Sequence, residues 1–367
     1  MKADVITLHS VANYGTQLQA LATQEKLKEY FDEVEFIDYR RPDTYGLNLM
    51  KTFSRGNFLR ALAILPTMLV WKSRFGRFQK KYLHLSKNTY LTQADLNKFQ
   101  DNADYYIVGS DQVWNSGWNN GVIKTYYLDF VDSRKPKFSF SSSFGQSRLG
   151  AEEASEVRDL LSGFQTLSVR EPSAVQIVKN QLGIDDVTQL VDPVLSLPAE
   201  YWRRIATGSV PKEKYILIYS LNRNYDLDMY AKALSRHTGI GLVRFCTRLD
   251  QVFRPGTARI IPNILDFINL IDHAVFVITD SFHATAFSML LNTPPICIYP
   301  EKYSSRISEF LKLTDSESRH LSSYNDFDII KQPMDFSRIN TILKAKREQV
   351  DLFLKRAVSL DLGDWNE

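Results

Sequence analysis

One pattern recurs along this chain: a short apolar run stops at a polar or charged residue, and a helical pattern begins within a few residues. The clearest example covers residues 274–291. Residues 274–279 predict a buried strand, and residues 286–291 predict the helix after the turn. Repeated strand-to-helix units are typical of α/β folds, in which ligands bind at the carboxyl ends of parallel strands. The pattern therefore indicates both the fold class and the edge of the sheet where a site should lie.

The turn in this example carries a candidate site. Thr279, Asp280 and Ser281 are residue types that cap helix N-termini, so free backbone N–H groups should point to where a phosphate or carboxylate docks. His283 follows them near the end of the strand. Two interpretations stay open: a ligand site with a histidine, or a capped turn whose histidine satisfies backbone groups.

The length of 367 residues predicts two domains, because a single core usually stops growing below that size. Pro198, Gly208 and Pro211 place the junction near residues 198–213. We expect an N-terminal domain over 1–205, a C-terminal domain over 206–335, and a terminal helix over 336–367 that packs back on the first domain. The predicted architecture is α/β, with two Rossmann-like doubly wound domains facing across a cleft.

The remaining predicted elements support this organisation. Strands are predicted at 3–8, 34–39, 105–109, 138–141, 167–170, 189–192, 215–219, 240–246 and 295–299. Helices are predicted from residue 15 to about residue 30, and at 173–182, 226–237, 264–271, 284–291 and 336–360. The first strand-to-helix link, residues 9–15, lacks the G-x-G-x-x-G fingerprint of dinucleotide-binding proteins.

Composition argues against several classes of protein. Cys246 and Cys297 are too few for a disulfide framework and belong to no C-x-x-C pair, so both are expected to be buried thiols. The six histidines show no paired ligand spacing, and no metal is expected. Asp4, His9 and Asn13 interrupt the N-terminal apolar stretch, so a secretory signal is not predicted and a cytoplasmic location is expected.

Charge is distributed unevenly although the net charge is only +3, which is too small to indicate nucleic acid as a partner. Residues 51–94 contain no acid, and their nine basic residues surround the apolar run 59–71. That run is too short to span a bilayer, which needs roughly 20 apolar residues. Two interpretations stay open: a helix lying on an anionic membrane surface, or an amphipathic helical insertion with a solvated basic face.

Several motifs, taken in order, resemble the polysaccharide pyruvyl transferase family. They are Asn13-Tyr14-Gly15-Thr16-Gln17-Leu18-Gln19-Ala20, Val108-Gly109-Ser110-Asp111-Gln112-Val113-Trp114-Asn115, Ser141-Ser142-Ser143-Phe144-Gly145, Ser168-Val169-Arg170-Glu171, Val191-Asp192-Pro193, Thr279-Asp280-Ser281-Phe282-His283-Ala284-Thr285-Ala286 and Ser304-Ser305-Arg306-Ile307. The resemblance implies a glycosyltransferase-B-type fold. It also implies transfer of the enolpyruvyl group of phosphoenolpyruvate to a sugar, which forms a pyruvate ketal without a cofactor. Ala284 stands where the family often has glycine.

The donor, phosphoenolpyruvate, carries a phosphate and a carboxylate, so its pocket needs cations of fixed geometry and oriented N–H donors. The resemblance assigns this role to Arg170, Lys302, Arg306 and Ser281, with His283 as phosphate contact and proton donor. An imidazole can act as acid or base near neutrality. For Arg170 the alternative is a salt bridge to Glu171 or to a neighbouring helix.

The resemblance places the acceptor sugar, which is free or lipid-linked, in the first domain with Asn13, Tyr14, Gln17 and Asp111. Asp111 is the candidate base for a sugar hydroxyl, and its structural alternative is a helix N-cap. A lipid-linked acceptor would bring the protein to the inner face of the membrane.

Two other enzyme classes compete with this interpretation. A transferase with a nucleotide-sugar donor would have the same architecture, since fold alone does not fix function. A serine hydrolase using Ser281, His283 and either Asp280 or Asp111 lacks the glycines of a nucleophile elbow. A non-catalytic relative that binds a polysaccharide is the third alternative.

Overall fold

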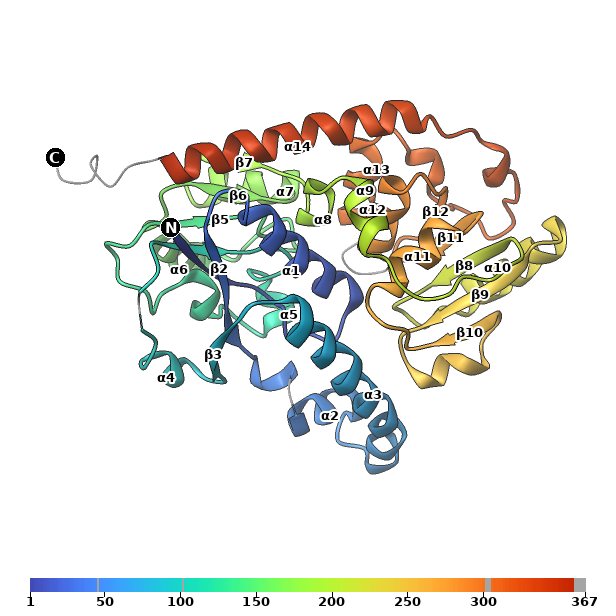
Figure 1. The fold of residues 1–367 in the computed structure, drawn as a ribbon, viewed down its shortest axis with the longest axis horizontal. Coiled ribbons are helices and arrows are strands. Elements are labelled where there is room, and N and C mark those ends of the chain that lie inside the picture. The colour runs from blue at the N-terminus through green and yellow to red at the C-terminus, as the bar shows by residue number, and fades with distance from the viewer. Residues whose placement is uncertain (45, 101, 301–304, 360–367) are drawn as a thin grey trace. The chain divides into compact units, whose positions relative to one another are not determined.

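The computed structural model describes residues 1–44, 46–100, 102–300 and 305–359, and the chain forms two compact units (Figure 1). Unit 1 comprises Met1–Gly56, Arg77–Ser196 and the chain from Lys346, and unit 2 comprises Asn57–Gly76 and Leu197–Ala345. Unlike the predicted first domain, unit 1 lacks residues 57–76 and 197–205. The reason lies in packing, because Trp71 donates to the carbonyl of Thr247 and Trp202 packs on Phe287, both in unit 2.

Unit 1 is built on a five-stranded sheet in the order β3-β2-β1-β4-β5, with every pair parallel. A two-stranded parallel sheet, β6-β7, continues from it through a bridge between Phe138 and Thr166. The strands are β1 (Lys2–Ile6), β2 (Glu33–Tyr39), β3 (Leu85–Tyr90), β4 (Tyr105–Val108), β5 (Lys137–Ser139), β6 (Leu167–Val169) and β7 (Val187–Gln189). All four residues of β4 are buried, as expected for a central strand covered on both faces.

Unit 2 repeats this design with a five-stranded parallel sheet in the order β10-β9-β8-β11-β12. Figure 1 shows these strands in that order, from β12 at the top to β10 at the bottom. The strands are β8 (Tyr215–Tyr219), β9 (Gly241–Cys246), β10 (Thr257–Ile260), β11 (Phe276–Thr279) and β12 (Pro295–Cys297). The chain is therefore α/β with two Rossmann-like units.

Helices connect the strands in both units. Those of unit 1 are α1 (Tyr14–Leu27), α2 (Gly46–Ser54), α4 (Gln93–Leu96), α5 (Ser116–Asn119), α6 (Ala151–Leu161), α7 (Pro172–Gln176) and α8 (Pro193–Ser196). Those of unit 2 are α9 (Ala199–Ile205), α10 (Tyr225–Thr238), α11 (Asp266–Asp272), α12 (Phe282–Leu290) and α13 (Ser305–Leu313). α3 (Phe58–Tyr82) and α14 (Phe336–Ser359) each contribute residues to both units. In the described part of the chain, no helix combines the length and apolarity needed to cross a bilayer.

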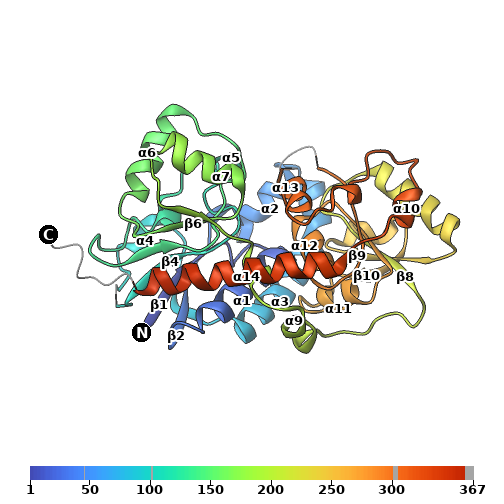
Figure 2. The ribbon, with the colours of Figure 1, turned by 90° about the horizontal axis from the view of Figure 1, so that it is seen from above.

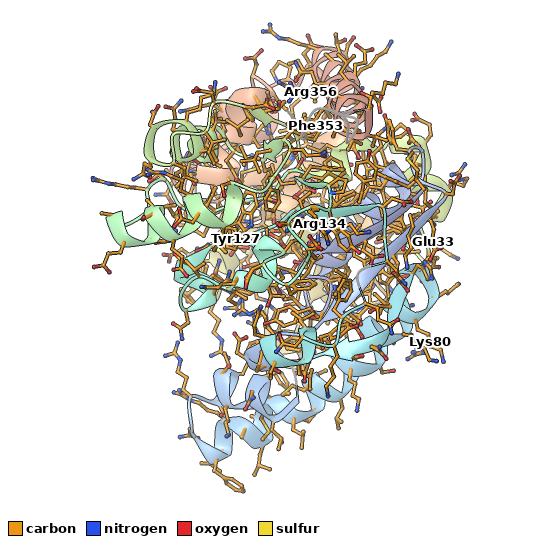
Figure 3. All side chains as sticks on the ribbon, turned by 90° about the vertical axis from the view of Figure 1, so that its left-hand side faces the viewer. Glu33, Lys80, Tyr127, Arg134, Phe353 and Arg356 are labelled. Carbon is orange, nitrogen blue, oxygen red and sulfur yellow. The ribbon has the colours of Figure 1, made fainter. Side chains whose placement is uncertain are left out.

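The C-terminal part of α14 packs on unit 1, and Figure 2 shows this helix along its full length. The Phe353 ring lies 6.3 Å from that of Phe138 in β5. Arg356 donates to Thr166 and pairs with Asp186, 2.8 Å between Arg356 NH2 and the Asp186 Oδ1 atom. Figure 3 labels Phe353 and Arg356 on this helix. The contacts join one apolar and one charged side chain of α14 to the edge of the unit 1 sheets.

Three strands differ from the sequence prediction. β3 and β10 are edge strands with several exposed or half-buried residues, so they lack the apolar run that marks a buried strand. β7 covers Val187–Gln189, whereas residues 189–192 were predicted, because Leu190 and the two residues after it lead into α8. Short strands with little apolar character are hard to place from sequence.

A buried carboxyl in the unit 1 sheet gives stability a dependence on pH. Asp4 of β1 lies directly opposite Glu35 of β2, and Lys2 Nζ lies 2.7 Å from Glu35 Oε2 and 3.6 Å from Asp4 Oδ1. Burial raises the pKa of the Asp4 carboxyl from 3.8 to about 6, with Lys2 opposing the shift and Glu35 adding to it. The folded state therefore holds a proton that the unfolded state releases near pH 4.

Replacing Asp4 by Asn should remove this dependence. Wild-type stability is expected to fall as pH rises from about 4 to about 6, because ionised Asp4 is poorly solvated in the folded state. Above that range, Asp4→Asn should have a free energy of unfolding higher by about 2 kcal/mol. Urea unfolding over a pH series measures this, with the exposed Glu152→Gln as control; equal pH profiles for Asp4→Asn and wild type would contradict the assignment.

Candidate functional site

The turn between β11 and α12 has the structure that its sequence predicts. Ser281 is the N-cap of α12, and its hydroxyl accepts from the Ala284 N–H at 3.4 Å. The Thr279 hydroxyl accepts from the Ser281 N–H at 3.0 Å. The Thr285 hydroxyl donates a hydrogen bond to the Ser281 carbonyl. These bonds hold the first turn of α12 directly against the end of β11.

Asp280 joins this turn to the neighbouring strand end. Its carboxylate accepts from the Leu221 N–H at 2.8 Å, the Asn222 N–H at 3.0 Å and the Asn222 amide at 2.9 Å. The hydroxyl of Ser220, directly after β8, donates to it at 3.3 Å. Asp280 is buried, so these donors are what make its burial tolerable. The carboxyl ends of β8 and β11 are thereby tied together by one side chain.

His283 and Arg306 occupy the first turns of α12 and α13. His283 is buried, and its imidazole lies 5.3 Å from the Phe282 ring at an interplanar angle of 77°. Phe282 in turn contacts Phe310 of α13 at 5.7 Å between ring centroids, so the two helices pack against each other. Arg306 is half-buried. We call Asp280, Ser281, His283 and Arg306 the unit 2 cluster; it combines a helix N-terminus, an imidazole and a guanidinium.

A second group of charged residues lies at the strand ends of unit 1. Arg170, directly after β6, donates through Nε to Glu171 Oε1 at 2.8 Å and through NH1 to Asp192 Oδ2 at 2.7 Å, and NH2 lies 3.8 Å from Asp111 Oδ1. All four side chains are buried. Burial opposes the charge of Arg170, but Glu171, Asp192 and Asp111 outweigh it and raise its pKa. We call these four residues the unit 1 cluster.

Asp111 is held by its own set of bonds. Thr16 of α1 donates to Asp111 Oδ2 at 2.7 Å, and the Gln112 N–H donates to Oδ1 at 2.9 Å. Its φ of 70° is left-handed, a conformation that Asp and Asn tolerate better than most residues. The alternative that Asp111 caps a helix is wrong, because the next helix, α5, is capped by Asn115. The alternative that Arg170 pairs with Glu171 is confirmed by their 2.8 Å contact.

The other predicted acceptor residues lie at the start of α1. Asn13 is the N-cap of α1 and accepts from the Thr16 N–H at 3.3 Å. Gln17 is fully buried and donates to the carbonyls of His9 and Val11. Tyr14 is buried as well. Of these three residues Asn13 is half-buried, and Gln17 fixes the backbone of the loop before α1.

The structure groups the predicted residues by unit. Ser281, His283 and Arg306 belong to unit 2, and Arg170 and Asp111 belong to unit 1. Lys302 lies outside the described residues. Sequence reasoning did not find that Thr16 and Asp192 hold Asp111 and Arg170, although both occur in the motifs that carried the family resemblance. The signal was present, but which side chains pair is not visible from sequence order.

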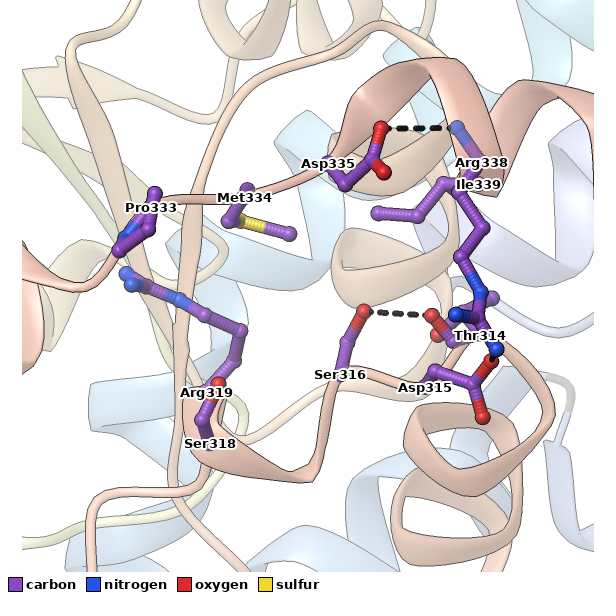
Figure 4. Close-up of a pocket in the computed structure, with 10 residues that line it drawn as sticks. All are labelled: Thr314, Asp315, Ser316, Ser318, Arg319, Pro333, Met334, Asp335, Arg338 and Ile339. Atoms are coloured by element: carbon purple, nitrogen blue, oxygen red, sulfur yellow. Dashed lines mark hydrogen bonds and ion pairs between the residues drawn. The ribbon is translucent and has the colours of Figure 1, made fainter.

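Unit 2 also contains a pocket of about 290 Å³, including the part open to solvent, away from the unit 2 cluster (Figure 4). It is lined by Thr314, Asp315, Ser316, Ser318, Arg319, Pro333, Met334, Asp335, Arg338 and Ile339. Arg338 pairs with Asp315, and Arg319 donates to the carbonyls of Pro295 and Ile329. Arg338 thus joins the start of α14 to the chain after α13, whereas Arg319 joins that chain to β12 and to Ile329.

The geometry also bears on nucleophilic and metal chemistry. Ser281 Oγ is engaged in capping α12, which is a structural role rather than that of an activated nucleophile. Across residues 1–44, 46–100, 102–300 and 305–359, no group of three or more His, Cys, Asp or Glu side chains is arranged to hold a metal ion. Cys246 and Cys297 are buried thiols whose pKa values burial raises to about 11.

Comparison with solved structures shows the fold. The S. aureus MnaA–UDP co-structure superposes with a TM-score of 0.54 at 11% identity, covering 98% of this chain and 97% of that chain. UDP-N-acetylglucosamine 2-epimerase from Rickettsia bellii gives 0.53 at 11% identity over 100% of both chains. UDP-GlcNAc 2-epimerase from Neisseria meningitidis, bound to UDP-GlcNAc, gives 0.51 at 12% identity, covering 97% of this chain and 100% of that chain. The units are thus of the glycosyltransferase-B type.

Comparison with sequences shows the family. A search of curated proteins found no match for the chain. The family model described as polysaccharide pyruvyl transferase matches residues 13–302, a stretch that contains the unit 1 cluster and, apart from Arg306, the unit 2 cluster. The match covers well over half of the chain. With these strand-end clusters on two Rossmann-like units, the chain belongs to the polysaccharide pyruvyl transferase family and is a transferase.

Proposed function

We propose that the protein transfers the enolpyruvyl group of phosphoenolpyruvate to a sugar of a polysaccharide or of a lipid-linked oligosaccharide precursor, forms a ketal and releases phosphate. The observation that carries the proposal is the unit 2 cluster. His283 lies in the capped first turn of α12, and Arg306 lies in the first turn of α13, which packs against α12. A helix N-terminus and a guanidinium are both suited to phosphate and carboxylate groups.

The chemistry assigns a proton transfer to His283. The imidazolium gives a proton to the methylene carbon of phosphoenolpyruvate, which becomes a methyl group, and positive charge develops at the central carbon. A sugar hydroxyl attacks that carbon and loses its proton to a base. A second hydroxyl then displaces phosphate, which leaves with the remaining proton. The two sugar hydroxyls thus lose two protons in total. This loss equals the one proton gained by the new methyl group and the one that leaves with phosphate.

We assign the base to Asp111 of the unit 1 cluster. Asp111 carries a carboxylate at a strand end, and its bonds to Thr16 and Gln112 fix its orientation. Arg170 is then a positioning residue, since its guanidinium bonds Glu171 and Asp192 and lies near Asp111. Asn13, Tyr14 and Gln17 shape the acceptor side of the same strand edge. Lys302 remains a proposed donor ligand on the family resemblance alone.

The proposal includes a cellular setting and a cofactor requirement. A lipid-linked acceptor would place the protein at the inner face of the cytoplasmic membrane, and capsule or exopolysaccharide synthesis is the kind of process it would serve. The histidine spacing gives no metal site. Transfer should therefore survive exhaustive chelation, and strict magnesium dependence would count against the donor model.

The competing donor is a nucleotide sugar, because two solved structures with the same fold hold UDP and UDP-GlcNAc. We expect phosphoenolpyruvate at saturating concentration to raise the midpoint of thermal unfolding by about 2–4 °C for each kcal/mol of binding, and UDP-GlcNAc to leave it unchanged. Thermal unfolding with each ligand measures this. Stabilisation by UDP-GlcNAc alone would reverse the assignment.

The role of His283 is tested by its replacement with Gln. His283→Gln should lower kcat by roughly 10²- to 10⁴-fold, because the donor of the methylene proton is lost. Mass spectrometry of the ketal product, with candidate sugar acceptors, measures transfer. The exposed His273→Gln in the same unit is the matched control. Normal turnover by His283→Gln would refute the assignment, provided that circular dichroism shows both variants folded.

Asp111→Asn tests the base while keeping a residue that accepts the left-handed backbone. We expect kcat to fall by roughly 10²- to 10⁴-fold with little change in the KM for phosphoenolpyruvate, because the carboxylate acts on the acceptor. If Asp111 has only a structural role, the Asp111→Asn variant should instead have a lower free energy of unfolding and an unchanged kcat. Steady-state kinetics and urea unfolding of the same preparation distinguish these outcomes.

A further inference from the structure

We infer that one face of α3 binds an anionic lipid surface. The face consists of Phe58, Leu62, Leu65 and Leu69, which we call the α3 stripe. Their side chains are 73%, 51%, 41% and 61% exposed. The inference rests on the proposed function in one respect: a lipid-linked acceptor would be located at such a surface.

The stripe is a single line along the helix. Its residues follow one another at intervals of four, three and four, which places them on one face of an α-helix. Such a row of large exposed apolar side chains is unusual for a soluble surface and marks an interaction site. Lys72 follows Leu69 by three residues and is exposed, so the line of apolar side chains ends in a cation.

The opposite face of the same helix anchors it to unit 2. Trp71 Nε1 donates to the Thr247 carbonyl at 2.7 Å, and the Thr67 hydroxyl accepts from the Leu249 N–H at 3.2 Å. Arg74 donates to the Asn263 side chain at 2.7 Å. Thr67 is nine residues after Phe58, about two and a half turns, so this anchored face points away from the stripe. The helix is therefore held in place without using its apolar side chains.

The positive charge of the segment that contains α3 favours an anionic partner. Residues 51–94 contain nine basic residues and no acid, and Lys72, which follows the stripe on the same side of α3, is exposed. Anionic headgroups attract such a segment, and the apolar side chains enter the boundary between headgroups and acyl chains. A second copy of this chain fits poorly, because a symmetric pairing would bring two acid-free basic segments together. No helix among the described residues can span the bilayer, so the contact is one of a helix lying on the surface.

Vesicle sedimentation tests the inference directly. The full chain should sediment with vesicles of equal parts phosphatidylglycerol and phosphatidylcholine at low salt, and much less with phosphatidylcholine alone. The triple variant Leu62→Ser, Leu65→Ser, Leu69→Ser should lower the partition coefficient by about a hundredfold or more, because three apolar side chains no longer enter the interface. Its matched control changes three exposed apolar side chains elsewhere in unit 2: Tyr225→Ser, Met229→Ser and Phe253→Ser.

A second pair of variants separates charge from apolar burial. Lys72→Gln should weaken binding by about fivefold, and the exposed Lys212→Gln should not. Wild-type protein that stays in the supernatant, or a stripe variant that sediments as wild type does, would overturn the inference. So would a stripe variant that changes only the oligomeric state in gel filtration, since the stripe would then face a second copy.

The same variants keep this inference distinct from the proposed function. On a water-soluble sugar acceptor, the stripe variant should transfer at the wild-type rate, because its changes lie outside both clusters. Vesicle binding without any pyruvyl transfer by the wild type would leave the lipid surface standing and refute the function. Pyruvyl transfer by a wild-type protein that does not bind vesicles would support the proposed function and overturn the inferred lipid-binding face.

Discussion

Every sheet pairing within the described residues is parallel, and this constraint decides where chemistry can occur. Parallel strands end at the same edge, so the turns that follow β4 and β6 meet in unit 1 and those that follow β8 and β11 meet in unit 2. The polar residues at the ends of these strands thereby become neighbours. Both clusters arise from this single geometric rule, applied twice along one chain.

Each cluster is held together by one buried charged side chain with several partners. In unit 2, Asp280 gathers N–H and hydroxyl donors from the residues after β8. In unit 1, Arg170 gathers carboxylates from three strand ends. A buried charge is costly unless it is fully partnered, so removing one partner leaves the other exposed to that cost. Asp280 and Arg170, with their partners, therefore hold the strand ends in fixed positions. A proton transfer at a defined position requires such fixed groups.

The sequence predicted the fold class, most strands and the β11–α12 turn, because these depend on local patterns: apolar runs, cap residues and helix periodicity. β3 and β10 escaped because an edge strand need not be apolar. The bond between Arg170 and Asp192 was not predicted, because Asp192 is 22 residues away along the chain. Side-chain pairing of this kind depends on how strands are ordered, which no local pattern contains.

Neither unit is a continuous stretch of sequence, since α3 and α14 each begin among the residues of one unit and end among those of the other. Any attempt to express a unit alone must therefore cut through two helices. A fragment ending before residue 197 would keep α3 but strip Thr67 and Trp71 of their hydrogen-bonding partners. The apolar side chains of α3 would then be exposed on both faces of the helix, and such a fragment should aggregate.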